Sequence, residues 1–533
     1  MSNSLKEVQV NHIDTLDNDD MLKGQVEERQ VFSAAMAEAL AKDPPRPYSK
    51  SMIKLYLILC VGYMCSATSG FDANTFGGIL AMPNFTEYFN SRGGSTEGLI
   101  TSLYVIGNMI GALPAGPIAD RWGRKSGILT GSAFALIGII IQTAAINTHM
   151  LMAGRFLLGL GVGVVQASGP AFVAELSHPA YRGIMTGIYQ TCFFVGTIVT
   201  TWLEFGLNYV GNKPVTWRFP LAFQAVPSLI ILFTVWFVPE TPRWLVGQGR
   251  DEEARQLLAK YHGNGNLESP IVELEMMEMK AAIDLEGSDK RWWDLRDFFM
   301  TRSARYRTYL VVAVALFATW DLPPTSYYLP LMVKTAGITD VTTQLLLNAI
   351  QTPVMFVAAI CGSKSTDLIG RRKMFIIGSS GMTLSMIVIT ACTARQAGHP
   401  AVGGTGIAFI YVFLVSFAFG WTPLQSLYIS EILTFSTRAK GLALFSLVSN
   451  GAGFLNTYLP PVAIQNVGYK FYFFYTIWDF VGIIVIYFTF IETRKRTLEE
   501  IEDIFHDPHP VKASLQRQKV YIARTGEVYM AEN

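Results

Sequence analysis

Asp120-Arg121-Trp122-Gly123-Arg124-Lys125 has a partner later in the chain, Asp367-Leu368-Ile369-Gly370-Arg371-Arg372. Two more signatures also occur twice at nearly the same spacing: Glu175 precedes Arg182-Gly183 as Glu431 precedes Arg438, and Pro239-Glu240-Thr241 corresponds to Ile491-Glu492-Thr493. Each signature follows a long apolar stretch. The repeat therefore predicts two like halves of membrane-spanning helices, the pattern of a secondary transporter with its substrate site between the halves.

The composition supports a membrane protein. Half of the 533 residues are hydrophobic and only 16% are charged, whereas soluble domains carry about 25% charged residues. The net charge of +1 gives no reason to expect a nucleic-acid partner. The five cysteines all fall in apolar segments and predict neither disulfides nor a metal site. Because there is no phosphate-binding loop and no arrangement of nucleophile and base, we expect no enzyme activity and no cofactor.

Twelve apolar runs are near the ~20 residues that span a bilayer. They predict an all-α integral membrane protein with twelve transmembrane helices in two six-helix, pseudo-symmetric halves. In the first half the predicted spans are 52–73, 97–117, 127–147, 151–174, 184–206 and 217–238. In the second half they are 308–333, 343–363, 373–394, 403–427, 440–463 and 470–491.

Basic residues decide the predicted orientation, because Lys and Arg gather in cytoplasmic links. They are dense after spans 2, 8, 10 and 12, so both termini should face the cytoplasm. We expect a multi-pass protein of the plasma membrane, and a monomer. The predicted parts are a cytoplasmic tail (1–50), a six-helix half (51–238), a cytoplasmic linker (239–307), a second half (308–491) and a cytoplasmic tail (492–533). Within the linker, Asp251 to Tyr261 has the pattern of a helix, and Lys290-Arg291-Trp292-Trp293 suits the headgroup region.

Two short patterns add detail. Asn84-Phe85-Thr86 falls outside the cell in this orientation, where N-glycosylation of Asn84 is expected; a chance match close to the membrane is the alternative. Glycines four residues apart in span 2 (Gly107, Gly111) and span 4 (Gly159, Gly163) allow close helix packing.

At its charged signatures the chain resembles the sugar porter family of the major facilitator superfamily. Gly116 with Asp120 to Lys125 is similar to the superfamily's motif in the link between spans 2 and 3. Pro239-Glu240-Thr241-Pro242-Arg243 resembles the sugar porter motif after span 6. Glu492-Thr493 followed by Arg496-Thr497-Leu498-Glu499 resembles the C-terminal motif, although Ile491 replaces its usual proline. The resemblance covers about residues 50 to 510.

A finer resemblance is to the fungal lactose-permease-like group. It is carried by Ala81-Met82-Pro83, by His178-Pro179-Ala180-Tyr181-Arg182-Gly183, by Ala259-Lys260-Tyr261-His262-Gly263, and by Thr422-Pro423-Leu424-Gln425 with Leu427-Tyr428. Such a grouping indicates ancestry, and substrates vary within it.

Asp72 is an acid within the first span, and an ionised side chain at membrane depth usually marks a pathway or a relay. In proton-coupled sugar porters a similar Gly-Tyr-Asp occurs where this chain has Gly70-Phe71-Asp72, and Arg155 matches the arginine that neighbours the acid. The resemblance implies that Arg155 holds the ionised carboxylate and that protonation releases it. A structural ion pair is the alternative.

The repeated charges are interpreted as a latch on the cytoplasmic side that opens as the halves move. A static set of charges that fixes topology is the alternative, and both can hold. The residues are Asp120, Arg121, Arg124, Glu175, Arg182, Glu240 and Arg243 in the first half and Asp367, Arg371, Arg372, Glu431, Arg438 and Glu492 in the second.

Amides are the candidate substrate contacts, because sugar hydroxyls need donors and acceptors. Gln190 and Asn456 match sugar-contacting amides of the family, and Gln425 and Asn450 are further candidates. Amides in helices also serve as interhelical hydrogen bonds. Span 7 departs from the family pattern: its usual amides are missing, and Asp321 with Pro323-Pro324 stands there instead.

The combined prediction is a proton-coupled importer of a sugar, a disaccharide of lactose type or a hexose, that works by alternating access. Its partners would be a small molecule, protons and the lipid bilayer. A carrier or exporter of a non-sugar metabolite is the first alternative, favoured by the altered span 7. A nutrient sensor that binds without transport is the second.

Overall fold

The computed structural model describes residues 42–44, 46–89, 94–211, 213–287, 296–320, 333, 338, 340–395, 400–434, 437–494, 496, 498–515, 519–522 and 528–531. The predicted span-7 stretch from Asp321 to Tyr328 and the run Lys290 to Trp293 lie outside these residues.

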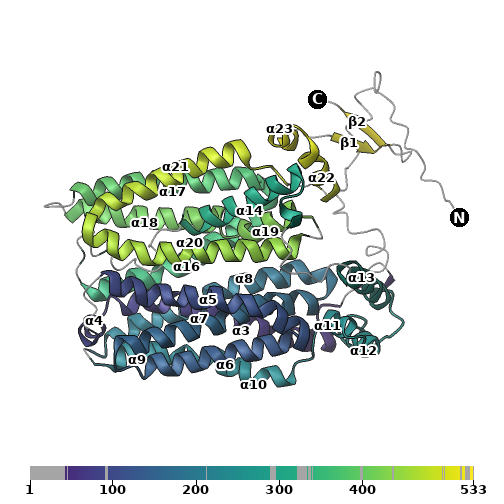
Figure 1. Cartoon of the computed structure of the whole chain (residues 1–533), viewed down its shortest axis with the longest axis horizontal. Coiled ribbons are helices and arrows are strands. Elements are labelled where there is room, and N and C mark those ends of the chain that lie inside the picture. Colours follow the sequence, from purple (N-terminus) through teal and green to yellow (C-terminus); the bar gives the residue numbers. More distant parts are fainter. Residues whose placement is uncertain are drawn as a thin grey trace.

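The first half consists of long helices that cross the molecule in alternating directions (Figure 1). Its segments are α3 (Lys50–Ile79), α5 (Gly94–Trp122), α6 (Arg124–Thr143), α7 (Thr148–Leu176), α8 (Arg182–Asn208) and a sixth made of α9 (Val215–Phe223), α10 (Ala225–Thr234) and the 3₁₀ turn η2 (Val235–Phe237). The short helix α4 (Pro83–Tyr88) and the 3₁₀ turn η1 (Pro179–Tyr181) lie in links.

The second half repeats this plan. Its segments are α14 (Arg302–Trp320), α16 (Val341–Ile369), α17 (Arg371–Arg395), α18 (Pro400–Gly420) with α19 (Leu424–Ile432), α20 (Arg438–Val467) and α21 (Tyr472–Thr489). The short 3₁₀ turn η4 (Gly468–Phe471) joins the last two. A proline at 423 separates α18 from α19, because proline cannot continue the helical hydrogen bonding.

By length and composition, ten described segments can cross a membrane, and one of these, Lys440–Thr489, contains both α20 and α21. The remaining segment, α14, has Arg302, Arg305 and Arg307 among its first six residues, and it ends at Trp320, next to residues outside the described ranges. The outer faces of the helices carry exposed apolar side chains, such as Phe233 (72% exposed) and Ile477 (63% exposed). Such faces suit contact with lipid, and the predicted all-α membrane fold is confirmed.

The links are helical as well. Between the halves lie α11 (Pro242–Gly247), α12 (Asp251–Tyr261), α13 (Pro270–Gly287) and the 3₁₀ turn η3 (Arg296–Phe298). The predicted helix from Asp251 to Tyr261 is thus confirmed. After the last span follow α22 (Leu498–His506), α23 (Pro510–Leu515) and a small antiparallel hairpin of β1 (Lys519–Ile522) and β2 (Val528–Ala531), which the sequence analysis did not anticipate.

Glycines bring α5 and α7 into contact. A Cβ atom at Gly107 or Gly111 would collide with backbone atoms of α7, and one at Gly159 or Gly163 would collide with the backbone of α5. The expected close packing at these four glycines is confirmed.

Gly123 and Gly370 make the same turn in the two halves, between α5 and α6 and between α16 and α17. Their φ angles are +95° and +101°, values that residues other than glycine rarely adopt. We call the end of the bundle that carries these turns the motif end. The opposite end, where α4 lies, is called the far end. Figure 1 shows α11, α12, α13, α22 and α23 all beyond the motif end.

Candidate functional site

Asp72 and Arg155 are buried inside the first half. Asp72 lies on α3 and Arg155 on α7, and neither side chain is exposed. Both carboxylate oxygens of Asp72 are buried and have no hydrogen-bond partner among the described residues. Arg155 is held by the ring of Phe76, one turn beyond Asp72, with 4.0 Å between guanidinium carbon and ring centre. Its Nε donates to the carbonyl oxygen of Ile100 at 3.4 Å.

A chain of buried polar groups lies next to this pair. Gln142 on α6 donates through Nε2 to Gln224, which follows α9. Gln224 donates to the hydroxyl of Thr75 at 2.7 Å, three residues after Asp72. Neither glutamine was predicted as a site residue, because single amides in apolar runs are usually packing contacts.

Two more acids are buried in the spans and were also missed. Glu204 on α8 is fully buried, and its carboxylate packs against Gly78 of α3 without a hydrogen-bond partner in the described part of the chain. Asp479 on α21 is 1% exposed. The signal that could have found them is the one used for Asp72, an acid within an apolar run.

The four candidate amides are not brought into one cluster by any contact seen here. Gln190 on α8 is exposed, and Gln425 on α19 and Asn450 on α20 are half-buried. Asn456 on α20 bridges helices: its Nδ2 donates to the carbonyl of Thr319 at 2.8 Å, and Tyr475 donates to its Oδ1 at 2.8 Å. Its amide therefore has the interhelical role that the sequence analysis named as the alternative.

Hydrogen bonds between the halves lie toward the far end. Asn208 of α8 donates to Thr342 of α16 at 2.9 Å, and the hydroxyls of Thr201 and Thr352 are 3.2 Å apart. Nearer the motif end, α8 is open: a Cβ atom at Gly183 or Gly187 would meet no atom within 4 Å.

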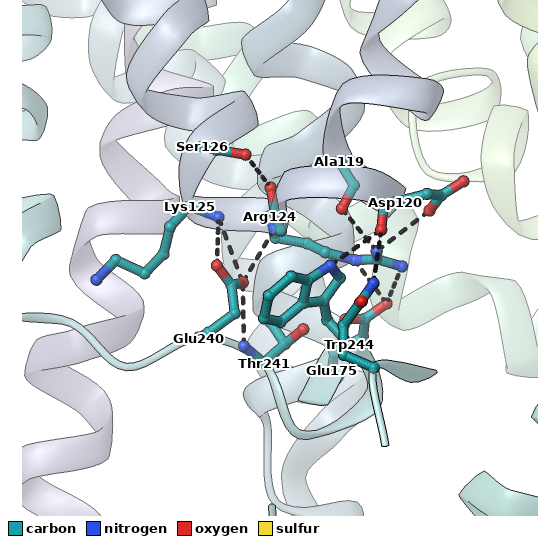
Figure 2. Close-up of polar contacts among 11 residues, drawn as sticks. Ala119, Asp120, Arg124, Lys125, Ser126, Glu175, Glu240, Thr241 and Trp244 are labelled. Atoms are coloured by element: carbon teal, nitrogen blue, oxygen red, sulfur yellow. Dashed lines mark hydrogen bonds and ion pairs between the residues drawn. The ribbon is translucent and has the colours of Figure 1, made fainter. Parts of the chain in front are cut away.

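At the motif end of the first half, Arg124 is the centre of a charge cluster (Figure 2). Its guanidinium is 3.0 Å from Glu175 and 3.2 Å from Asp120. Glu240 instead accepts backbone N–H groups, from Arg124 at 2.9 Å, from Lys125 at 3.3 Å and from Thr241 at 3.1 Å. Burial raises the pKa of Glu240, against the opposing effect of these N–H groups.

The second half repeats the cluster. Arg371 is 2.6 Å from Glu431 and 2.7 Å from Asp367. Glu492 accepts the backbone N–H groups of Arg371 at 2.9 Å and of Arg372 at 3.3 Å. The central contacts of the two clusters thus match, and Glu240 and Glu492 accept the N–H groups that follow the turns at Gly123 and Gly370.

Several arginines that were predicted to belong to the charge clusters have other side-chain partners. Arg121 stacks on its neighbour Trp122 at 5.4 Å. Arg182 faces Glu275 of α13 at 3.6 Å, and Arg372 donates to the carbonyl of Tyr487 at 2.5 Å. The side chains of these three arginines thus have partners outside the clusters, and Arg372 joins the second cluster only through its backbone N–H to Glu492. Arg243 follows Thr241 at the start of α11, and the side chain of Arg438 lies outside the described residues.

The linker helices are tied to the end of α7. The Nδ1 atom of His262 is 2.6 Å from Glu275, and its Nε2 is 3.2 Å from the carbonyl oxygen of Leu176. The ring of His178 is 5.1 Å from that of His262. Burial, and then the neighbouring His262, lowers the pKa of His178 to about 4. Two segments of the finer family resemblance, around residues 178 and 262, thus contact each other.

Asn84, where N-glycosylation is predicted, takes part in a hydrogen bond. Its Nδ2 atom, to which a glycan would be attached, donates to the carbonyl oxygen of Lys213 at 2.9 Å, and its Oδ1 is buried. Glycan attachment would have to break this contact. Among the described residues there is also no group of three His, Cys, Asp or Glu side chains placed to hold a metal ion.

Comparisons with known proteins agree with this architecture. Residues 58–505 match the family model described as "Sugar (and other) transporter". The chain is 27% identical over 486 residues to the MFS-type transporter criB of Aspergillus cristatus, covering 90% of this chain and 100% of that protein. It is 27% identical over 475 residues to the high-affinity glucose transporter 1 of Candida albicans, covering 86% of each.

The fold is similar to solved transporters. The inward open conformation of the xylose transporter XylE from E. coli has a TM-score of 0.71 at 21% identity, covering 84% of this chain and 99% of that one. The finer grouping with lactose permeases stays a prediction. Because the family model matches most of its length, the chain belongs to the sugar (and other) transporter family, the sugar porter family of the major facilitator superfamily.

Proposed function

We propose that this protein imports a sugar together with a proton by alternating access. The observation that carries the proposal is Asp72, a fully buried carboxylate on α3 without a hydrogen-bond partner in the described part of the chain. A buried acid of this kind is costly unless it is neutralised, so it is suited to take up and release a proton. Arg155 is the charged neighbour that acts on it when it is ionised.

Proton coupling has enough energy for accumulation. One proton that moves inward across about 100 mV releases about 2.3 kcal/mol, which supports a roughly fifty-fold gradient of sugar. A proton on Asp72 would weaken its attraction for Arg155 and let the halves rock about the substrate.

Each charge cluster lies within one half: Arg124 and Arg371 each tie two successive helices to a third. We propose that the clusters change only if the helices of one half shift against each other, because both are formed in the described state. With hydrogen bonds between the halves toward the far end and open space beside α8 at the motif end, the described state resembles one open at the motif end. We place the motif end, and both termini, in the cytoplasm, since basic residues gather there. We place the protein in the plasma membrane.

For the substrate we propose a hexose or a disaccharide of lactose type. Gln190 is exposed on the open side of α8, where a sugar entering between the halves would meet it. Gln425 and Asn450 are half-buried, and we keep them with Asn456 as candidate contacts. The glucose transporter of Candida albicans among the relatives supports a hexose.

The test is uptake of labelled glucose, xylose, lactose and cellobiose by cells that express the protein, with and without a protonophore. We expect accumulation of at least one sugar, abolished by the protonophore. Asp72→Asn should lose accumulation by an order of magnitude or more and keep exchange of sugar across the membrane. Asn keeps the shape of the side chain and removes only the proton site. Full accumulation by Asp72→Asn at equal surface expression would refute proton coupling through this residue.

A carrier of a non-sugar metabolite is the second candidate. It is favoured by the sequence of span 7, where Asp321 and two prolines replace the family's amides. The same assay separates the two: no uptake of any sugar by protein confirmed at the cell surface would favour this candidate.

A further inference from the structure

A basic cavity of about 730 Å³ lies at the motif end of the second half. It is formed by the start of α14 and of α17, the end of α21, and the C-terminal helices α22 and α23, which Figure 1 shows beyond the ends of the spans. Tyr306 at the start of α14 donates to the carbonyl oxygen of Thr489 at 2.5 Å, so the two helix ends lie at the same level. None of the residues that line the cavity is one of the four candidate amides or takes part in the hydrogen bonds between the halves described above.

The cavity has an excess of positive charge. Four cationic side chains, Arg302, Arg305, Arg372 and Lys512, line it with a single carboxylate, Asp507. Asp507 is engaged by the backbone N–H of His509 at 2.6 Å. In the described part of the chain, Arg302 and Arg305 are exposed and form no ion pair with a carboxylate.

Arg372 gives the cavity a built donor. Its side chain is 8% exposed, and its Nε is buried without a hydrogen-bond partner among the described residues. The carbonyl of Tyr487 accepts from its Nη2, and its guanidinium lies 5.2 Å from the centre of the Tyr487 ring. These contacts hold the guanidinium in place while one donor stays unmet, the condition in which an added acceptor is favourable.

The rim of the cavity is apolar and exposed. Phe488 is 68% exposed, Tyr487 56%, Leu515 50% and Tyr309 44%. Tyr309, Tyr487 and Phe488 lie on the membrane-spanning helices α14 and α21. Inorganic phosphate or a soluble phosphate ester would contact only the cationic groups, whereas a lipid would also cover this rim with its acyl chains.

We propose that this cavity binds an anionic phospholipid, with the headgroup phosphate against Arg302, Arg305 and Arg372 and the acyl chains along the Phe488 rim. A phosphorylated inositol lipid fits a volume of this size and the number of cationic groups. Basic pockets at helix ends on the cytoplasmic side are suited to such headgroups. The inference needs the membrane fold alone, so it stands whether or not the transported molecule is a sugar.

The test uses the full-length protein in phosphatidylcholine nanodiscs with and without phosphatidylinositol 4-phosphate, and native mass spectrometry of the released protein. We expect lipid-bound protein only with the phosphoinositide. Arg302→Gln/Arg305→Gln should weaken binding by roughly ten- to thirty-fold, since each cationic group near a membrane surface contributes to the affinity. The matched control is Arg255→Gln/Lys260→Gln, which removes the same charge from exposed positions of α12.

Two further arms separate the sources of phosphate. Phe488→Ala should weaken binding of the lipid and leave binding of soluble inositol phosphate unchanged. If soluble inositol phosphate binds as tightly as the lipid, the lipid assignment is overturned. The site itself would be overturned if the wild type and Arg302→Gln/Arg305→Gln bound the lipid with equal affinity and unfolded at the same temperature.

Discussion

Gly123 occupies a backbone conformation that only glycine adopts readily, with φ of +95° and ψ of +164°. A Cβ atom there would also collide with the carboxylate of Glu240, which fixes the turn. We therefore expect Gly123→Ala to lower the free energy of unfolding by about 1–3 kcal/mol. Thermal unfolding of the purified protein measures this effect. Gly187→Ala is the control, since that glycine is helical with open space around it; an equal loss in both variants would contradict the argument.

The lowered pKa of His178 leads us to expect a loss of stability in acid. A histidine in an unfolded chain has a pKa of about 6.5, whereas burial and His262 lower the pKa of His178 to about 4 in the folded protein. Between these values the unfolded state binds more protons, so stability falls as the pH drops from about 6.5 to 4 and levels off below. The total loss is up to about 3 kcal/mol.

The variant His178→Asn tests this pH dependence. The Nδ1 atom of His178 accepts the backbone N–H of Ala180 at 3.2 Å, and the amide oxygen of asparagine can keep this bond. The midpoint temperature of thermal unfolding, measured from pH 7.5 to pH 4.5, should fall less steeply for the variant than for the wild type. Parallel curves would assign the acid sensitivity to other groups.

At this scale, the sequence predicts charged residues better than neutral ones. Asp72 and Arg155 stand out because charge is costly within an apolar run, and the structure buries both. Gln142 and Gln224 do not stand out, since an amide is tolerated at many helix positions. The role of Glu240 could not be predicted either: a glutamate beside many arginines suggests an ion pair, but its carboxylate accepts backbone N–H groups instead.

At the scale of elements, α12 and α13 form a unit attached to the spans. They share a small apolar core that includes Leu258 and Val272. Glu275, 3% exposed, connects this unit to His262 and Arg182. Loss of the carboxylate leaves the buried Nδ1 atom of His262 without its partner, which costs about 1–3 kcal/mol. We therefore expect Glu275→Ala to release the unit from the end of α7.

Hydrogen–deuterium exchange measures this release. Amide exchange over residues 251–287 should rise by at least ten-fold in Glu275→Ala, while exchange in the spans stays unchanged. The control is Glu253→Ala on α12, which breaks an exposed pair with Arg250, the residue before that helix. Unchanged exchange in the Glu275 variant would mean that apolar contacts alone hold the unit.

Most elements could be predicted from hydrophobicity, and the exceptions have physical reasons. Apolar runs predict the spans because the bilayer sets their length, and α12 agrees with its predicted bounds. The break between α18 and α19 lies inside one continuous apolar run, so hydrophobicity does not reveal it although Pro423 is there. The strands β1 and β2 are apolar runs of only about four residues in a polar tail, and a search for spans of ~20 residues does not detect them.

At the scale of the whole molecule, the two halves are joined by hydrogen bonds toward one end of the bundle and are open toward the other. Paired clusters at Arg124 and Arg371 lie at the motif end, each within its own half. Hydrogen bonds between the halves lie toward the far end, through Asn208 with Thr342 and Thr201 with Thr352. Alternating access requires that these contacts break when the far end opens.

A covalent link at the far end should therefore stop transport. The side chains of Asn208 and Thr342 are 2.9 Å apart between donor and acceptor, so cysteines at both positions can be joined by a short thiol cross-linker. The background should lack the exposed Cys60 and Cys361. We expect cross-linked protein to lose at least nine-tenths of its transport activity and a reducible cross-linker to allow full recovery. Each single cysteine variant is the control for modification alone.

Labelling of a further variant, Gly187→Cys, distinguishes a locked transporter from an unfolded one, because a thiol reagent still reaches the open side of α8 in the linked protein. Undiminished transport by the linked protein would mean that the far end need not open, and the two halves would then have to pass their substrate by another route.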